Sequence, residues 1–252
     1  MATIKKATTT KTGPVRSLLT AKEFLQQLKS IKPKTLNDNL RFFRGEDSKT
    51  KSIGVRMASL FALAKSFMQM PVEEIKELLE SDYYEARMGA VSIMDFQARD
   101  KKTTQDRKKE LFDLYIKRHD QINNWDLVDR SAPHVIGGYL SDKPRKVLYK
   151  LAKSKNPNER RTAIVSTWFF IRENDLEDTF KIAELLVHDK DETVNKAVGS
   201  WVREAGKRDK RKLLDFLNRH AATMPRITLR YAIEKLDKKE KEFYMNAKKG
   251  EA

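Results

Sequence analysis

The segment NERRTAI at residues 158–164 decides the fold, because related helix-like segments occur three more times along the chain. The others are EARMGAV (85–91), NNWDLV (123–128) and ETVNKAV (192–198). Each segment ends in two consecutive small or apolar residues, and the four segments can be aligned on this pair. The first residue of the pair is Ala90, Leu127, Ala163 or Ala197, so the intervals are 37, 36 and 34 residues. Each interval has room for two helices and two turns, which is the period of an α-solenoid of HEAT type.

The rest of the chain also has the spacing of amphipathic helices, with apolar residues every three or four positions. Examples are AKEFLQQLKSI (21–31), RKVLYKLA (145–152) and RKLLDFL (211–217), whereas alternating runs typical of β-strands are nearly missing. The sequence therefore predicts an all-α fold, an α-solenoid of HEAT-like repeats in which second helices line the concave side of a curved shell. We expect this domain over residues 19–237, after a disordered basic arm (1–18) and before a charged C-terminal tail (238–252).

The chain is strongly basic, since 52 Lys and Arg residues against 36 Asp and Glu residues give a formal net charge of +16 over 252 residues. Such an excess favours a polyanionic partner, either nucleic acid or an anionic membrane surface. Lysines crowd both ends of the chain, so basic tails on a soluble protein are the simplest alternative. The stretch 143–161 is also rich in Lys and Arg, however, and a basic segment inside the folded region favours a basic concave binding face.

Several function classes are disfavoured by what the sequence lacks. Without cysteine there is no disulfide framework and no thiolate metal site, and the four scattered histidines form no metal-binding motif. No apolar run approaches the roughly 20 residues that span a bilayer, and the first residues lack the apolar core of a signal peptide. We therefore expect a cytoplasmic protein that holds no metal and does not enter a membrane.

The stretch NNWDLVDRSAP (123–133) places one tryptophan and two aspartates within five residues of this basic chain. Trp125 and Asp129 are four residues apart and share a helix face, whereas Asp126 lies about 100° round the helix from Trp125. Asp126 is therefore expected to be an early-turn acid favoured by the helix dipole. In the repeat register, Trp125 falls in one column with Met88, Arg161 and Asn195.

A carboxylate in a basic groove is useful where something cationic must be held. Hydrolysis of a glycosidic bond passes through an oxocarbenium-like transition state, which a fixed carboxylate stabilises. An alkylated purine is itself cationic before it leaves, and the face of an indole attracts cations. A Trp–Asp pair in a positive concave surface is thus suited to the removal of alkylated bases from DNA.

At these residues the sequence resembles the AlkD-like DNA alkylpurine glycosylases, which are built from HEAT-like repeats. The resemblance covers residues 35 to 236 approximately. It rests mainly on NNWDLVDRSAPHVIGGYL (123–140), with weaker support from RTAI (161–164), KAVGSWVREAGK (196–207) and IGVRMASLFALAK (53–65).

The resemblance implies a monomeric, monofunctional enzyme that excises N3- and N7-alkylated purines from duplex DNA without a metal or cofactor, associating with the nucleoid through DNA. It also implies that the base is not drawn into a deep pocket. By matching positions, Trp125 would pack against the sugar of the lesion, and Asp129 would stabilise the oxocarbenium and position water. Arg161 would hold a backbone phosphate, and its basic neighbours Arg160 and Lys155 are further candidates for DNA contacts.

Two departures from the family pattern affect the cleft. The family often has a second cleft tryptophan directly after the glycine of Lys-Ala-x-Gly, but Ser200 holds that place here and Trp201 follows it. One residue turns a helical side chain by about 100°, so Trp201, although a candidate for DNA contact, is expected to face the core. A family tyrosine corresponds to Phe42, a further candidate contact that lacks the hydroxyl. Trp168 lies among apolar neighbours and is expected in the core.

Two classes of function remain open on the sequence. The first is a DNA glycosylase acting through Asp129 and Trp125. The second is a non-catalytic HEAT-repeat nucleic-acid-binding or scaffold protein, in which Trp125 is a core residue and Asp129 only caps a helix or pairs with Arg130 or a lysine. The presence of both Trp125 and Asp129 favours the first class, and the displaced Trp201 favours the second.

Overall fold

The computed structural model describes residues 19–31 and 50–247 of the chain, and these are built from helices. Within these ranges no strand forms, and the pairing of Lys51 with Tyr83 is an isolated bridge. The predicted all-α fold is therefore confirmed for the described residues. Phe42 and the arm at residues 1–18 lie outside them.

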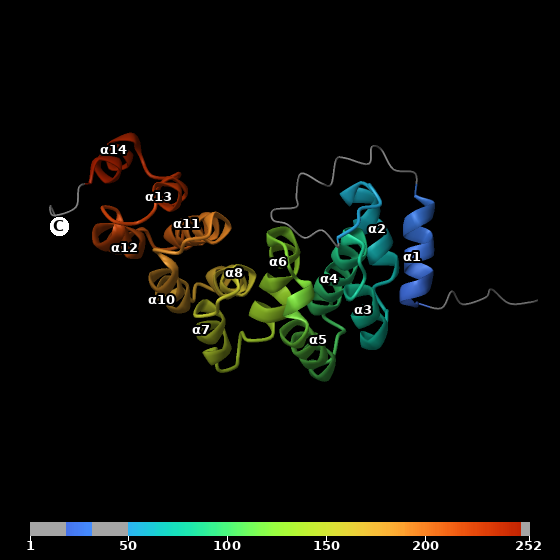
Figure 1. Ribbon diagram of the computed structural model, residues 1–252. Coiled ribbons are helices and arrows are strands. Elements are labelled where there is room, and N and C mark those ends of the chain that lie inside the picture. The colour runs from blue at the N-terminus through green and yellow to red at the C-terminus, as the bar shows by residue number, and fades with distance from the viewer. Residues whose placement is uncertain (1–18, 32–49, 248–252) are drawn as a thin grey trace, which may run out of the picture.

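The helices form two curved layers, an inner one that faces the hollow of the arc and an outer one behind it (Figure 1). The inner layer contains α2 (Met57–Ser66), α4 (Tyr84–Arg99), α6 (Trp125–Ala132), α8 (Pro157–Ser166), α11 (Glu192–Gly206) and α13 (Arg226–Ala232). The outer layer contains α3 (Val72–Leu79), α5 (Gln105–Lys117), α7 (Lys146–Ala152), α10 (Glu177–Leu186) and α12 (Lys210–His220). The remaining elements are α1 (Ala21–Ser30), η2 (His119–Gln121), η3 (Pro133–Gly138), α9 (Trp168–Arg172) and α14 (Lys238–Asn246).

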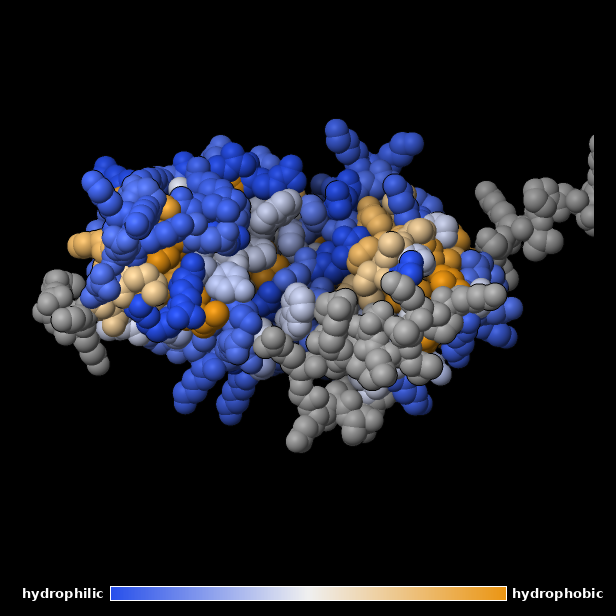
Figure 2. All heavy atoms as spheres, turned by 90° about the horizontal axis from the view of Figure 1, so that it is seen from above, coloured by the Kyte–Doolittle hydropathy of each residue, from blue (hydrophilic) through white to orange (hydrophobic). Residues whose placement is uncertain are grey.

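The residues that were aligned between the sequence repeats lie at equivalent positions of the stacked inner helices. Ala90, Leu127, Ala163 and Ala197 lie on α4, α6, α8 and α11, and all four are at most 1% exposed. Each of these helices packs against the next, and three of them also pack against the outer helix that precedes them in the chain. The small buried side chains allow close stacking, so equivalent positions of successive inner helices form a row. Seen from above, the surface of the molecule is mostly hydrophilic, with hydrophobic areas towards its two ends (Figure 2).

Local signals explain where several helices begin. Asn156 caps α8, because its Oδ1 accepts a hydrogen bond of 2.9 Å from the backbone N–H of Asn158, and Pro157 occupies the first turn, where no N–H partner is needed. By contrast, α4 begins after Tyr83 without a side-chain cap.

A buried carboxylate fixes the segment that leads into α2. Glu85 of α4 is fully buried and accepts hydrogen bonds from Ser52 Oγ (2.7 Å) and from the backbone N–H groups of Ile53 (3.0 Å) and Gly54 (2.8 Å). The φ of Gly54 is 83°, a left-handed conformation that favours glycine. This clamp sets the start of α2 against α4, which brings Met57 and Phe61 towards the inner face.

The folded structure continues beyond residue 237, where the sequence suggested a charged tail. Asp237 and Glu240 form a reciprocal capping box that starts α14. Tyr244 of this helix is only 5% exposed, and its hydroxyl donates a hydrogen bond of 2.8 Å to Asn218 Oδ1 on α12. The lysine-rich C-terminal segment therefore packs as a helix as far as Asn246.

The chain after α6 continues directly into the π-helical segment η3, which packs against α8. A Cβ on Gly137 would overlap the carbonyl oxygen of Ser166 and lie 3.0 Å from the Cβ of Phe169. A Cβ on the neighbouring Gly138 would come no closer than 3.3 Å to the ring of Phe169. Glycine is therefore required at 137 by helix packing, and not at 138.

We expect Gly137→Ala to lower the free energy of unfolding by about 1–3 kcal/mol, the usual cost of overpacking a close contact. Gly138→Ala is the matched control and should change it by about 1 kcal/mol at most, since alanine also favours helix. Urea titration followed by circular dichroism measures both variants. Equal stability of the two would contradict the packing argument.

Candidate active site

An ion pair between neighbouring inner helices forms the centre of the site. The guanidinium of Arg161 on α8 donates from Nε to Asp129 Oδ1 (2.9 Å) and from Nη2 to Asp129 Oδ2 (2.7 Å). Its Nη1 donates to the carbonyl oxygen of Thr193 at the start of α11. The side chain of Arg161 is 7% exposed, whereas that of Asp129 is 30% exposed. One arginine thus joins three successive helices and leaves one side of the carboxylate open.

The expected partner of Arg161 was a backbone phosphate, whereas in the structure Nε, Nη1 and Nη2 each donate to a group of the protein. These bonds use three of the five N–H donors of the guanidinium. The contact with phosphate stays a prediction. Within this structure Arg161 positions Asp129, because its planar fork holds both carboxylate oxygens at once.

Trp125 lies beside this pair, as the shared helix face predicted. It is the first residue of α6 and is partly exposed, and the guanidinium carbon of Arg161 lies 5.7 Å from the centroid of its ring. The predicted column therefore brings Trp125 and Arg161 together, with Asp129 one turn further along α6. Met88 and Asn195, the other two members of the column, are 3% and 5% exposed.

A cavity of about 330 Å³ opens beside Asp129. Its lining residues come from α6, α8, α11 and α13: Trp125, Asp129, Arg161, Thr193, Lys196, Ser200, Trp201 and Tyr231. Trp201 was expected to face the core, but it is partly exposed and lines this cavity. The reason is a hydrogen bond of 3.0 Å, which the Nε1–H of Trp201 donates to the carbonyl oxygen of Val165 on α8. This bond holds the indole between α11 and α8.

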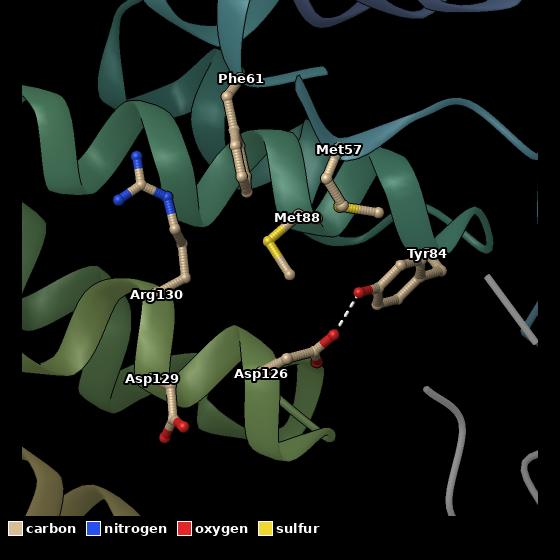
Figure 3. A pocket seen from close by; sticks show the side chains of 7 residues that line it. All are labelled: Met57, Phe61, Tyr84, Met88, Asp126, Asp129 and Arg130. Atoms are coloured by element: carbon tan, nitrogen blue, oxygen red, sulfur yellow. Dashed lines mark hydrogen bonds between the residues drawn. The ribbon is translucent and has the colours of Figure 1, made fainter. Parts of the chain in front are cut away.

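A second cavity of about 320 Å³ lies on the other side of α6 and is shown in Figure 3. Its walls include the apolar side chains of Met57, Phe61 and Met88. Tyr84 and Asp126 point towards one another there, and the tyrosine hydroxyl donates to Asp126 Oδ2.

Asp126 therefore does more than interact with the dipole of α6. Its Oδ1 accepts hydrogen bonds from Asn124 Nδ2 (2.8 Å) and from the backbone N–H of Leu127 (2.9 Å). Burial raises the pKa of the Asp126 carboxyl above its ordinary value of 3.8, although the hydroxyl of Tyr84 acts in the opposite direction.

A third cavity, of about 300 Å³, also borders Asp129 and contains residues that the sequence did not single out. Asp95 of α4 has a side chain only 1% exposed and accepts hydrogen bonds from Arg130 Nη1 (2.6 Å) and His134 Nδ1 (2.8 Å). Arg130 and His134 are four residues apart in the quoted motif, and this spacing was the available signal that they share a face. Trp168 lines the same cavity and is partly exposed, so the expectation that it is a core residue was wrong.

The basic stretch from 143 to 161 is divided between different surfaces. Arg160 donates to both carboxylate oxygens of Asp189 (2.6 and 2.9 Å) and to the carbonyl oxygens of Ser154 and Lys155, so its role in the structure is to close the turn before α8. The side chain of Lys155 is exposed in this turn. Lys146 and Lys150 are exposed on α7, which belongs to the outer layer and not to the inner face (Figure 1). The basic concave face stays a prediction.

Among residues 19–31 and 50–247, no group of three or more His, Asp or Glu side chains is placed to hold a metal ion. Over the same residues, none of the helices has the length and apolar character needed to cross a bilayer.

Comparison with known proteins agrees with this geometry. The profile of the family described as DNA alkylation repair enzyme matches residues 24–236. The chain belongs to this family. All the residues around the Asp129–Arg161 pair, from Met57 to Tyr231, lie within the matched range of the DNA alkylation repair enzyme family.

A solved structure has a similar fold. The crystal structure of AlkD2 from Streptococcus mutans superposes with a TM-score of 0.51 at 17% sequence identity, over 86% of this chain and 97% of that one. At this identity the likeness concerns the fold, which is the helical-repeat fold predicted from the sequence. No curated protein sequence matches the chain significantly.

The raised pKa of Asp126 predicts how stability depends on pH. A carboxyl whose pKa is higher in the folded than in the unfolded chain stabilises the fold below its unfolded pKa, and this contribution is lost as pH rises through the folded pKa. We therefore expect the stability of the wild type relative to Asp126→Asn to fall as pH rises from about 4 towards 7.

Urea titrations of both proteins across this range measure the difference. Tyr84→Phe removes the hydroxyl that favours the charged carboxylate, so its loss of stability should extend to higher pH. A difference between wild type and Asp126→Asn that does not change with pH would contradict the raised pKa.

Proposed function

We propose that this protein is a monofunctional DNA glycosylase that hydrolyses the N-glycosidic bond of cationic N3- and N7-alkylated purines in duplex DNA. One observation carries the proposal: Asp129 is a partly exposed carboxylate fixed by a bidentate arginine between cavities lined by Trp125, Trp168 and Trp201. Membership of the DNA alkylation repair enzyme family supports DNA as the partner.

In this proposal Asp129 stabilises the transition state electrostatically. Cleavage leaves positive charge on the sugar, and a carboxylate already held in place needs no reorganisation to meet that charge. Arg161 binds both oxygens from one side, but a carboxylate can accept about four hydrogen bonds, so its open side can still orient a water molecule. Arg161 is a positioning residue, because it holds both oxygens of the carboxylate in place.

The indoles supply the second part of the mechanism. Trp125 begins α6 beside Asp129, and its face attracts the cationic sugar or base. Trp201 lies across the same cavity, with its N–H bound to the carbonyl oxygen of Val165. The aromatic groups therefore bind the lesion, while Asp129 responds to the charge that develops when the bond breaks.

The alternative is a non-catalytic nucleic-acid-binding or scaffold protein. The observation that favours it is the ion pair itself, because both oxygens of Asp129 are bound to Arg161 in the way a purely structural pair would be. Both functions include binding to DNA, so only release of a base distinguishes them.

Asp129→Asn keeps the shape of the side chain and removes its charge. We expect it to slow release of 3-methyladenine and 7-methylguanine from methylated duplex DNA by about 10²–10³-fold, a typical loss for one preorganised electrostatic group. DNA affinity should be equal or slightly higher, because a carboxylate near phosphates opposes binding. Single-turnover assays of free base and a DNA-binding titration measure the two effects.

The control is Asp126→Asn on the same helix, which should reduce the rate much less because Asp126 is bound to Tyr84 and Asn124. If Asp129→Asn releases bases at the wild-type rate, another group carries the chemistry. If the wild-type protein releases none, the scaffold function takes its place.

DNA affinity should also fall steeply with salt, since binding to phosphates releases counterions. For six to ten phosphate contacts the loss is about 10³–10⁵-fold between 50 and 200 mM salt. Lys155→Ala should lower the slope of log affinity against log salt by about 1. Arg160→Ala should instead lower thermal stability, because Arg160 is bound to Asp189. Affinity that is independent of salt would contradict phosphate binding.

A further inference from the structure

A stripe of three lysines lies on the surface of α7. Lys146 and Lys150 are exposed on this helix, and Lys153 is exposed directly after it. On a helix of 3.6 residues per turn these positions fall within about 60° of one another, so the side chains share one face. The surrounding segment 143–155 contains six Lys and Arg residues and no Asp or Glu. The mechanism proposed for Asp129 uses none of the three lysines.

The lysine stripe points away from the inner face. Leu148, Leu151 and Ala152, on the opposite side of α7, are buried. The helix packs against α8 of the inner layer and against α10 of the outer layer, and it lies on the outer side of the arc (Figure 1). Because the buried side of α7 faces its neighbours, the lysines face outwards and do not belong to the cleft that contains Asp129.

The acidic residues beside α7 are bound to other cations. Asp175 and Asp178 both accept hydrogen bonds from Arg145 Nη1, at 2.6 and 2.7 Å. Glu177 forms an ion pair of 2.5 Å with Lys181, one turn later on α10. No ion pair joins the three stripe lysines to any residue in the described ranges 19–31 and 50–247. The stripe therefore keeps its positive charge, and the repulsion between like charges three and four residues apart is not compensated.

The stripe has the chemistry of a surface that binds a phosphate backbone. Each lysine offers a compact charge on a flexible stem, which can reach phosphates regardless of base sequence. Duplex DNA carries one negative charge for about every 1.7 Å of its axis, so a linear set of lysines meets phosphates along its length. A protein interface or a membrane-binding helix would add apolar side chains. Among the described residues, however, the large exposed apolar side chains are Leu185 and Phe243, on α10 and α14.

We propose that the lysine stripe of α7 is a second DNA-binding surface, on the outer layer of the solenoid. One molecule then holds a duplex on its inner face and another duplex, or a distant part of the same one, against α7. The inference rests on the DNA binding proposed for the inner face and does not depend on base excision. Binding at the stripe is electrostatic, so it is independent of alkylation and sensitive to salt.

A capture assay with two unmodified duplexes tests the inference. The protein is loaded onto a biotinylated duplex on beads, and retention of a second, fluorescent duplex is then titrated. The double variant Lys146→Gln, Lys150→Gln removes two charges from the stripe. We expect its affinity for the second duplex to be about tenfold lower, and the slope of log affinity against log salt to fall by about 2.

The matched control is the double variant Lys101→Gln, Lys102→Gln, which removes the same charge from an exposed turn after α4. It should retain the second duplex as the wild type does. Release of 7-methylguanine from methylated DNA should proceed at one rate in all three proteins, because the stripe lies outside the cleft. Circular dichroism shows whether the three proteins are equally folded.

The outcomes separate this inference from the proposed function. Wild-type protein that loads onto the first duplex but retains no second one, or equal retention by both double variants, would overturn the stripe and leave the glycosylase proposal standing. Excision that falls together with retention would also overturn it, since α7 would then contact the same DNA as the cleft. Tighter binding to phosphatidylserine vesicles than to DNA, lost in the stripe variant, would assign the surface to a membrane instead. Retention of the second duplex without any excision by the wild type would support the stripe and end the glycosylase proposal.

Discussion

The bidentate ion pair between Asp129 and Arg161 is the interaction on which the inner face depends. It joins α6 to α8, and the bond from Arg161 to the carbonyl oxygen of Thr193 extends the connection to α11. Removing one member of such a pair leaves a charge without its partner, at a cost of about 3–5 kcal/mol where the pair is buried. The same pair fixes the carboxylate that borders all three cavities around α6. Stability and chemistry are therefore linked at this point.

The repeat architecture explains why these residues meet at all. Small buried residues at equivalent positions let the inner helices stack closely, and the stacking places residues 88, 125, 161 and 195 in one row. The sequence interval between repeats predicted this row, because helix pairs of nearly constant length return to the same orientation. The shared face of Trp125 and Asp129 followed from helical geometry alone, since both belong to one helix.

What the sequence could not predict depends on side-chain reach between helices. Helical geometry predicted that Trp201 faces the core, but a hydrogen bond to α8 holds its indole at the cavity. Likewise, the partner of Arg161 could be assigned only when α6 and α8 were seen side by side. The exposed lysines of α7 form part of a basic stretch in the chain, yet the fold places them in the outer layer. Composition gives the charge of a segment, whereas the layer to which it belongs is set by tertiary packing.

The row along the hollow has a consequence for how such a protein can diversify. Each repeat supplies its own side chains to the row, while small residues outside the row make most of the stacking contacts. Arg161 is the exception, because it binds both α6 and α11. A substitution in one repeat can therefore alter the cleft locally and leave the architecture intact, as loops do on a rigid scaffold. Ser200 is such a position: it lines the cavity beside Asp129, whereas its neighbour Gly199 makes the close contact between α11 and α13. In this sense the solenoid separates the evolution of substrate fit from the evolution of fold.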